Sequence, residues 1–458
     1  MFSSANYSGM FTDFYELSMI QGYFLAEMHR KQANFDYFFR RNPFGGGFTV
    51  FAGLETLTEA LDEFRFSDTD LEYLKSQGFK KEFINYLSEF SFQADVFSVN
   101  EGEVVFPNEP VLRISGNLAE AQLVESLVLN ILNFQSLIAT KAARIKLAAS
   151  GKLLADFGMR RAQGLGAIHA TRAAAIGGVL TTSNVYSAKI FNLEASGTMA
   201  HSWVQSFDSE LEAFRTFAKY YPDSAILLVD TYNTLDSGVP NAITVAKELE
   251  QKGKQLKGIR LDSGDLAKLS KKARAMLNAE NLGYVKIVLS NQLDEYLIRS
   301  LLLQNAPVDF FGVGTSLATG APDASLDGVY KLSRLDNENR MKISDNVSKT
   351  TLPGIKQIVR HTQNNQFVKD TIELENKRQN GLAENDELLL KKVITQGKLL
   401  RKPTGIFPIS EYCASRLAQL PDEHKRFENP QLYPVIVDDE LNKVKMKLTE
   451  NYESFTYS

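Results

Sequence analysis

The strongest chemical signature in this sequence is the run Arg260–Asp265, which reads Arg-Leu-Asp-Ser-Gly-Asp. Side chains alternate along a strand, so Arg260 and Asp262 share one face. An arginine can bind a carboxylate or phosphate through two parallel hydrogen bonds, and a neighbouring carboxylate can hold magnesium or accept ribose hydroxyls. The structural alternative is an internal Arg260–Asp262 ion pair, with Asp262 or Ser263 capping the next helix.

A second candidate is the histidine that ends the run Ser196–His201. The pattern predicts one helix through Trp203–Tyr220, with His201 in its first turn. A neutral imidazole can act as a nucleophile or as an acid–base group. Asp230 ends a separate expected strand and could orient the ring. A histidine with a purely structural role is the alternative.

Two further runs lie at the carboxyl ends of expected strands. Asp156–Arg161 places the ring of Phe157 beside two guanidinium groups, an arrangement that suits an aromatic anion. Gly312–Thr315 offers glycines that let backbone N–H groups approach a phosphate, together with a threonine hydroxyl. The structural alternatives are a core phenylalanine with surface arginines, and a tight turn.

The elements that must position these runs lie between residues 151 and 330, where short apolar runs alternate with amphipathic segments. Strands are predicted at Leu153–Phe157, Ala225–Val229, Lys257–Leu261, Val285–Leu289 and Val308–Phe311. Helices are predicted through Ala167–Gly177, Asn241–Gln251, Leu266–Leu277 and Asp294–Leu303. Apolar strands separated by such helices indicate a parallel sheet that is buried on both faces. If the sheet forms a barrel, the candidate runs gather at the rim made by the carboxyl ends of its strands.

The flanking regions lack this rhythm and predict α+β structure. In residues 11–135 the expected elements are helices at Glu55–Phe64 and Asp68–Leu74, the second capped by Ser67, strands at Ala94–Val99 and Val104–Arg113, and a helical stretch at Leu118–Ser150. Within Val104–Arg113, Pro107 and Pro110 allow only interrupted or edge pairing. In residues 331–458 they are strands at Gln357–Arg360, Gln366–Lys369 and Leu388–Val393, and helices at Ile409–Ala418 and Asp438–Thr449. We expect domains at 1–135, 136–330 and 331–458, with the last packing on the first.

Composition excludes several classes of protein. The chain has 458 residues, 44% hydrophobic and 23% charged, with a net charge of -4. It is too long for one compact core, and it lacks the basic field that nucleic acid or an anionic membrane requires. Cys413 is the single cysteine, which excludes an intrachain disulfide and a cysteine-rich zinc site. We see no apolar stretch of membrane-spanning length and no leader pattern, and we expect a cytoplasmic protein.

Taken together, the runs resemble the nicotinate phosphoribosyltransferase family over nearly the whole chain. The matching runs are Thr12–Leu17, Arg41–Gly47, Asn133–Gln135, Ala139–Arg144, Phe157–Gly164, Thr182–Asn184, Ser196–His201, Val229–Tyr232, Arg260–Asp265 and Gly312–Thr315. No single run is specific. Their number and order leave the structural alternatives little room.

The resemblance implies an α/β fold: an irregular α/β barrel domain, with an α+β domain formed by the N-terminal and C-terminal parts. It also implies a homodimer whose active sites are shared between subunits, a magnesium ion, and phosphoribosyl pyrophosphate and ATP as substrates. The pyridine ring would lie between Phe157 and Tyr15 of the other chain. The remaining implied roles are nicotinate binding by Thr198 and Arg260, phosphorylation by ATP of His201, contact with phosphoribosyl pyrophosphate by Thr315, phosphate binding by Arg160, Gly312 and Gly314, and a ribose or magnesium contact by Asp262.

One position bears on the choice between the acid and the amide substrate. Similar enzymes that use nicotinamide carry an aspartate where Ser183 stands, and a serine hydroxyl can donate to the nicotinate carboxylate. A nicotinamide phosphoribosyltransferase and a catalytically silent binding protein are the alternatives. One departure from the family pattern is Leu165–Ile168, where many relatives read Pro-Asp-Gly-Gly, and it leaves the shape of that loop open.

Overall fold

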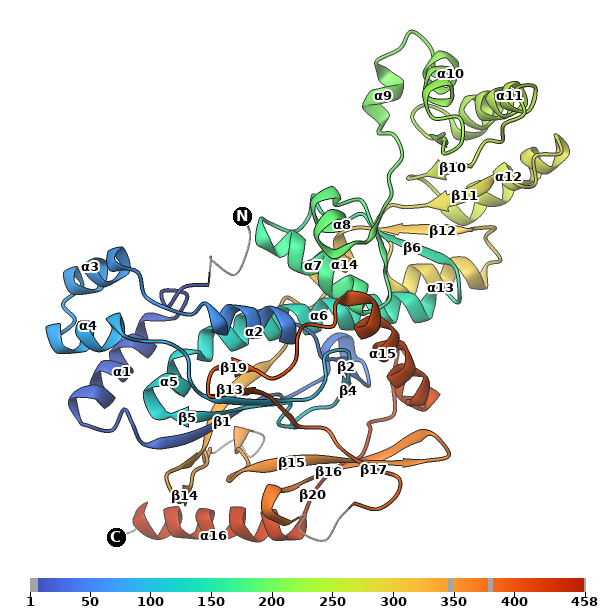
Figure 1. The fold of residues 1–458 in the computed structure, drawn as a ribbon. Helices are drawn as coiled ribbons and strands as arrows, with labels where there is room; N and C mark the ends of the chain where they lie inside the picture. Colours follow the sequence, from blue (N-terminus) through green and yellow to red (C-terminus); the bar gives the residue numbers. More distant parts are fainter. Residues whose placement is uncertain (1–6, 345–348, 378–381, 457–458) are drawn as a thin grey trace. The chain divides into compact units, whose positions relative to one another are not determined.

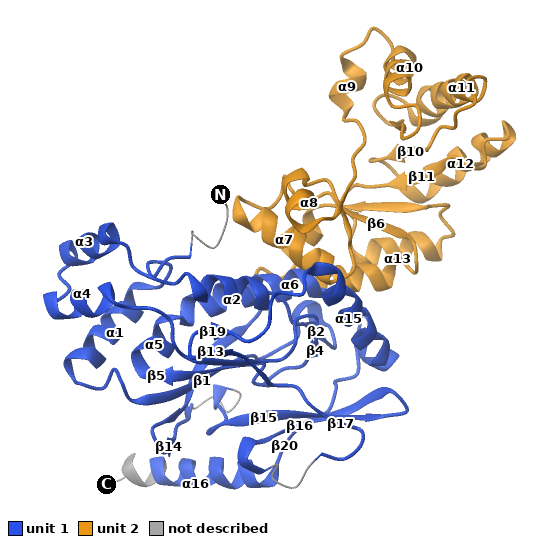
Figure 2. Cartoon of the chain, in the orientation of Figure 1, with its two compact units in different colours: residues 1–140, 325–458 blue, residues 141–324 orange. Residues whose placement is uncertain are grey.

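The computed structural model describes residues 7–344, 349–377 and 382–456, which form two compact units (Figure 2). Unit 1 comprises residues 1–140 and 325–458, and unit 2 comprises residues 141–324. Both ends of the chain therefore build unit 1. The expected boundaries at 135 and 330 lie within a few residues of these divisions. Among the described residues, no helix is long and apolar enough to cross a membrane.

Unit 2 is organised around a sheet that has seven parallel strands among the described residues (Figure 1). The strands run in the order β8-β7-β6-β12-β11-β10-β9, and every adjacent pair is parallel. The first strand of the unit, β6, therefore pairs with the last, β12, as in a barrel, and the edges of the sheet are β8 and β9. The strands are β6 (Leu153–Asp156), β7 (Thr181–Thr182), β8 (Glu194–Ala195), β9 (Ile226–Leu228), β10 (Gly258–Leu261), β11 (Lys286–Leu289) and β12 (Phe310–Val313). This curled parallel sheet confirms the expected α/β fold class.

The helices of unit 2 follow the strands in sequence. They are α7 (Leu165–Ile176), α8 (Val185–Phe191), α9 (His201–Gln205), α10 (Glu210–Tyr220), α11 (Val239–Glu250), α12 (Leu266–Ala279), α13 (Glu295–Leu303) and α14 (Thr315–Thr319). The single helix expected through Trp203–Tyr220 is wrong. The chain leaves the helix after Gln205, and Ser209 starts α10 by accepting a hydrogen bond from the Glu212 N–H at 3.2 Å.

Unit 1 contains an antiparallel sheet in the order β14-β13-β1-β5-β3-β18-β19. Its strands are β1 (Gln32–Phe39), β3 (Asp95–Ser98), β5 (Leu112–Asn117), β13 (Gly328–Leu335), β14 (Glu338–Asn339), β18 (Lys391–Thr395) and β19 (Lys398–Leu399). The N-terminal part of the chain gives unit 1 the helices α1 (Phe14–Leu25), α2 (Leu54–Asp62), α3 (Asp68–Ser76), α4 (Lys81–Ser88), α5 (Leu118–Leu123) and the start of α6 (Glu125–Ala148). A large apolar core includes the Phe35 and Tyr330 rings, stacked with centroids 5.0 Å apart.

The C-terminal part adds a second sheet to unit 1, in the order β17-β15-β16-β20. Its elements are β15 (Lys356–Gln363), β16 (Gln366–Leu374), β17 (Asp386–Leu388), β20 (Val435–Val437) and the helices α15 (Ile406–Gln419) and α16 (Asp439–Thr456). The buried guanidinium of Arg360 ties this sheet to the N-terminal part, because it binds Glu103 at 2.6 Å as well as Asp370. Glu103 also accepts from Arg416 at 2.7 Å. Truncating one partner of such a buried network leaves the other buried charges without a partner, which is strongly destabilising.

The local predictions in unit 1 have mixed outcomes. The cap of α3 is confirmed, since Ser67 and Asp70 form a reciprocal capping box. The interruption expected within Val104–Arg113 is confirmed: β4 (Val104–Val105) pairs with β2 (Thr49–Val50) in a separate sheet, the chain turns at Asn108, which has a φ of 68°, and β5 begins at Leu112. The strand expected at Leu388–Val393 is likewise divided between the end of β17 and the start of β18.

Candidate active site

A cavity of about 640 Å³ lies at the carboxyl ends of the unit 2 strands, as the strand-end argument predicts. Residues that follow β6, β7, β8, β10, β11 and β12 line it, and Arg260 reaches it from within β10. The predicted residues in the lining are Phe157, Arg160, Ser183, Thr198, Arg260, Asp262, Gly312, Gly314 and Thr315. Segments far apart in the sequence therefore meet in one concave site.

Arg260 is the centre of the polar side of this cavity. Its guanidinium donates to three different groups: Nη1 to the Thr198 hydroxyl at 3.0 Å, Nε to the Ser290 hydroxyl at 2.9 Å and Nη2 to Asp262 Oδ1 at 2.9 Å. The Ser290 hydroxyl also donates to Asp262 Oδ1. The Arg260–Asp262 ion pair of the structural alternative is thus present, and it lies in a cavity wall. Asp262 and Ser263 do not cap α12, because Asp265 does so through the Lys268 N–H.

The ring of Phe157 packs against the strand that carries the glycines. A Cβ atom at Gly312 would lie 2.4 Å from two atoms of the Phe157 ring, far inside van der Waals contact. Gly312 belongs to β12 itself and does not start the turn after it, which corrects the expected strand end at Phe311. The Arg260 guanidinium carbon lies 5.5 Å from the centroid of the Phe157 ring. Ring and cation therefore border the same space, as binding of an aromatic anion requires.

Asp156 holds the loops beneath this ring together. It is only 3% exposed, and its Oδ1 accepts from the Gly158 N–H at 2.7 Å. Its Oδ2 accepts from the hydroxyls of Thr171 and Thr182, at 2.7 and 3.0 Å. One buried carboxylate thus fixes the turn after β6 relative to α7 and β7. The sequence argument assigned Phe157 to ligand binding and gave Asp156, the last residue of β6, no role.

His201 begins α9 directly after Ala200, which lines the cavity. The sequence suggested that Asp230 orients its ring, but the structure places Thr231 there, with 3.1 Å between His201 Nδ1 and the Thr231 hydroxyl. Asp230 instead accepts from the Asp262 N–H and the Ser263 hydroxyl through Oδ2, both at 2.7 Å. Asp230 therefore supports the loop that carries Asp262.

Three family models match the chain in sequence order. They are the nicotinate phosphoribosyltransferase N-terminal domain over residues 10–133, the nicotinate phosphoribosyltransferase family over 153–379 and the C-terminal domain over 356–445. A nicotinate phosphoribosyltransferase from Bacillus subtilis is 40% identical over 96% of this chain and 97% of its own length. The chain belongs to the nicotinate phosphoribosyltransferase family.

Solved structures agree with this membership of the nicotinate phosphoribosyltransferase family. The crystal structure of human nicotinic acid phosphoribosyltransferase superposes with a TM-score of 0.84 at 29% identity, and covers 95% of this chain and 99% of that one. The structure of nicotinate-nucleotide pyrophosphorylase from Pyrococcus furiosus gives a TM-score of 0.73 at 26% identity, over 90% and 95% of the two chains. The resemblance stated from the sequence is therefore confirmed, and the loop at Leu165–Ile168 that departs from the family pattern forms the first turn of α7.

Two carboxylates of this family member suit a magnesium ion that is bound mostly through substrate oxygens. Asp230 Oδ1 is buried and has no hydrogen-bond partner among the described residues, and the Asp262 N–H lies against the same carboxylate. Magnesium is usually held by one or two protein carboxylates plus phosphates and water. The described part of the chain contains no cluster of three or more His, Cys, Asp or Glu side chains that could hold a metal ion.

Other site residues escaped the sequence argument. Ser290, Asn291 and Gln292 line the cavity after β11, and the last two have positive φ values of 89° and 45°. Such backbone strain outside glycine is often found at functional sites. No motif marks these residues, although the position after a buried strand was a usable signal.

Tyr15 lies on α1 in unit 1 and is 47% exposed. Its neighbour Glu16 is buried and anchors α1 to the start of α6, accepting from the Ser126 N–H at 3.0 Å and from the Ser126 hydroxyl at 2.7 Å. Burial raises the pKa of the Glu16 carboxyl to about 7, against the opposing effect of hydrogen bonds from Thr12 and Ser126. The exposed ring of Tyr15 is thus presented by a helix whose attachment depends on a titrating group.

We expect Glu16→Gln to flatten the pH dependence of stability between about pH 4.5 and 7. The folded-state pKa lies above the unfolded value, so the unfolded chain loses its proton first and the free energy of unfolding falls as the pH rises through this window. The total contribution is of the order of 2 kcal/mol after allowance for solvent screening. Urea unfolding across the window measures it, with exposed Glu63→Gln as the control. Equal slopes in wild type and Glu16→Gln would contradict the expectation.

Proposed function

We propose that this chain is a nicotinate phosphoribosyltransferase, which joins nicotinate to 5-phosphoribosyl 1-pyrophosphate and forms nicotinate mononucleotide and pyrophosphate. The reaction is the first step of NAD synthesis from nicotinate. The proposal includes coupling to ATP through a phosphohistidine at His201, release of ADP and phosphate, a cytoplasmic location, and a homodimer in which Tyr15 of each subunit covers the ring on Phe157 of the other. The observation that carries it is the convergence of Phe157, Arg260 and Thr198 on one cavity, in a chain that belongs to this family.

The bond changes require positioning more than nucleophilic chemistry by the protein. The electron pair of the pyridine nitrogen forms the new bond to C1 of the ribose, while the C1–O bond breaks and pyrophosphate leaves with the electron pair of that C1–O bond. Arg260 suits the nicotinate carboxylate because it already holds Thr198 and lies beside the Phe157 ring. A magnesium ion at Asp262 would stabilise the charge on the pyrophosphate oxygens. Arg160, Gly314 and Thr315 line the same cavity and suit its phosphates.

A turnover assay tests the proposal directly. Nicotinate and nicotinamide are each supplied with phosphoribosyl pyrophosphate, with and without ATP, and formation of the mononucleotide is followed. We expect nicotinate to be the preferred substrate and ATP to stimulate its turnover. Preference for nicotinamide would make the chain an amide-specific enzyme, and absence of turnover with either pyridine would make it a binding protein. Either result overturns the proposal.

Substitution of Ser183 tests how the carboxylate is distinguished from the amide. Ser183 lines the cavity, and Ser183→Asp places a negative charge where the nicotinate carboxylate would lie. We expect kcat/KM for nicotinate to fall at least about tenfold, or about 1.4 kcal/mol. Ser183→Asn, which adds bulk without charge, is the control. Unchanged nicotinate kinetics in Ser183→Asp would exclude charge discrimination at this residue.

Substitution of Thr231 tests the positioning of His201. Thr231→Val removes the hydroxyl that lies 3.1 Å from His201 Nδ1 and preserves the shape of the side chain. We expect ATP-dependent, acid-labile labelling of the protein from γ-labelled ATP to slow about tenfold, since partners that orient a reactive imidazole typically contribute that much. Thr231→Ser should restore the rate, and His201→Ala should give no label. Wild-type labelling in Thr231→Val, or persistent label in His201→Ala, would remove the corresponding residue from this role.

A further inference from the structure

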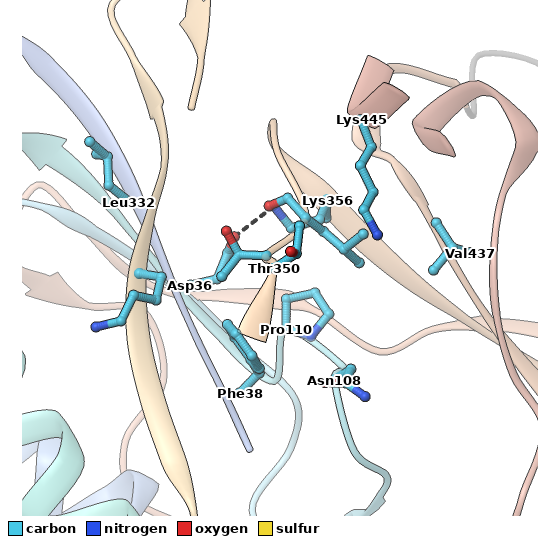
Figure 3. Close-up of a pocket in the computed structure, with 12 residues that line it drawn as sticks. Asp36, Phe38, Asn108, Pro110, Leu332, Thr350, Lys356, Val437 and Lys445 are labelled. Atoms are coloured by element: carbon cyan, nitrogen blue, oxygen red, sulfur yellow. Dashed lines mark hydrogen bonds and ion pairs between the residues drawn. The ribbon is translucent and has the colours of Figure 1, made fainter. Parts of the chain in front are cut away.

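Unit 1 contains a cavity of about 230 Å³ that takes no part in the proposed reaction (Figure 3). Its walls come from both ends of the chain: β1 and β13 of the large sheet, the segment before β15, the end of β20, and α16. The residues lining it are Asp36, Phe38, Asn108, Pro110, Lys331, Leu332, Thr350, Thr351, Leu352, Lys356, Val437 and Lys445. The C-terminal part of the chain therefore completes a cavity that begins in the N-terminal part.

A buried carboxylate in this wall is only half satisfied. Asp36 is 2% exposed, and its Oδ2 pairs with the Lys356 ammonium at 2.7 Å. Lys356 also donates to the carbonyls of Leu352 and Gly354, at 2.9 and 2.6 Å, so its three protons are all used. Asp36 Oδ1 has no hydrogen-bond partner among the described residues. Oδ1 itself has almost no accessible surface, so a ligand in the cavity would meet the negative charge of the Asp36 carboxylate in the wall, which no donor on Oδ1 offsets.

A cation borders the same cavity. Lys445 extends from α16 toward the space beside Thr350 and Val437 (Figure 3), and no hydrogen bond or ion pair of its ammonium is found in the described part of the chain. Lys331 is already engaged, because it donates to Glu125 at 3.3 Å and to the Tyr330 carbonyl at 2.7 Å. Lys445 is therefore the lysine that is free to bind an anion.

Between these polar groups the wall is apolar, with contributions from Phe38, Pro110, Leu332, Leu352 and Val437. Apolar walls with a few polar groups of fixed sign are typical of sites for small organic ligands. We propose that this cavity binds a small organic anion that carries an N–H or O–H donor, with the donor toward the Asp36 carboxylate, the apolar body against these walls and the negative charge on Lys445. The ligand is distinct from the substrates of unit 2, and the inference does not depend on the proposed function.

Three flat probes of nearly equal size separate the interactions. 4-Aminobenzoate carries both the donor and the negative charge, benzoate lacks the donor and aniline lacks the charge. Binding is measured on the full chain by ligand-observed saturation-transfer NMR, with saturating nicotinate present to occupy any aromatic-carboxylate site in unit 2. We expect 4-aminobenzoate to bind at least about tenfold more tightly than either comparison compound.

Variants assign the binding to this cavity. Lys445→Met should weaken 4-aminobenzoate at least about tenfold and leave aniline unchanged, whereas Lys443→Met, an exposed lysine on the same helix, should change neither. Asp36→Asn should remove the advantage of 4-aminobenzoate over benzoate. If loss of the ion pair with Lys356 unfolds Asp36→Asn, which a melting curve would reveal, the comparison of Lys445→Met with Lys443→Met decides whether 4-aminobenzoate binds in this cavity.

Three outcomes overturn the inference. The first is absence of 4-aminobenzoate binding up to about 10 mM, which would mean that the Asp36 carboxylate attracts no ligand donor into the cavity. The second is equal affinity for the three probes. The third is equal loss of binding in Lys443→Met and Lys445→Met. Turnover of nicotinate is measured on the same samples, so failure of this site is distinguishable from failure of the proposed function.

Discussion

Arg260→Lys is expected to lower kcat/KM for nicotinate by about 100- to 1000-fold, although it keeps the positive charge. The guanidinium donates from three nitrogens to Thr198, Ser290 and Asp262 at once. A lysine ammonium is a compact charge that cannot reproduce this planar fork. Charge-assisted hydrogen bonds contribute roughly 1.5–3 kcal/mol each, so loss of one or two is enough for the expected change, which corresponds to about 2.7–4.1 kcal/mol.

The substitution is expected to affect both substrates. With a lysine at position 260, the ammonium cannot keep the hydrogen bonds to both Thr198 and Asp262, so the walls that bind the ring and the ribosyl donor shift together. Steady-state kinetics with each substrate varied in turn measure this. Arg215→Lys is the matched control, because Arg215 is exposed, pairs with Glu248 and lies outside the cavity lining. Kinetics of Arg260→Lys within about threefold of Arg215→Lys would mean that charge alone suffices at residue 260.

The barrel of unit 2 could be predicted because its strands are buried on both faces. A parallel strand covered by helices must be apolar throughout, so β9, β10 and β11 stand out in the sequence as short runs between amphipathic segments. Once the strands are parallel, their carboxyl ends share an edge. The gathering of Phe157 and Asp262 at one rim followed from that geometry alone.

The parts that could not be predicted depend on neighbours distant in the sequence. Nothing around Thr231 indicates that its hydroxyl lies against His201, which is 30 positions away and on another element. The half-satisfied carboxylate of Asp36 depends on Lys356, which arrives from the far end of the chain. The break between α9 and α10 did carry a local signal, since Ser209 is a good N-cap, but the apolar periodicity on both sides obscured it.

Gly312 was correctly predicted to line the site, but the reason that the sequence suggested for a glycine there was incomplete. The sequence suggested that its lack of a side chain lets backbone N–H groups approach phosphate. In the structure a Cβ at this position would lie 2.4 Å from the Phe157 ring, whereas Gly314 is less crowded, with Phe157 O at 3.4 Å. The requirement for glycine at residue 312 therefore comes first from the aromatic ring. A methyl group there must displace either the ring or β12, and the ring at the cavity edge is the softer of the two.

We expect Gly312→Ala to lower kcat/KM for nicotinate about 100-fold, because a displacement of about 1 Å in a group that positions the reactant can cost that much. The control is Gly197→Ala: Gly197 lines the same cavity, but a Cβ there meets nothing within 4 Å, so its kinetics should change less than about threefold. Two explanations for the glycine, room for the Phe157 ring and backbone access to phosphate, predict changes in KM for different substrates. Displacement of Phe157 raises KM for nicotinate, whereas loss of a backbone contact to phosphate raises KM for phosphoribosyl pyrophosphate. A rise in KM for phosphoribosyl pyrophosphate alone would mean that Gly312 is required for phosphate binding. It would contradict the role proposed for the Phe157 ring in binding nicotinate.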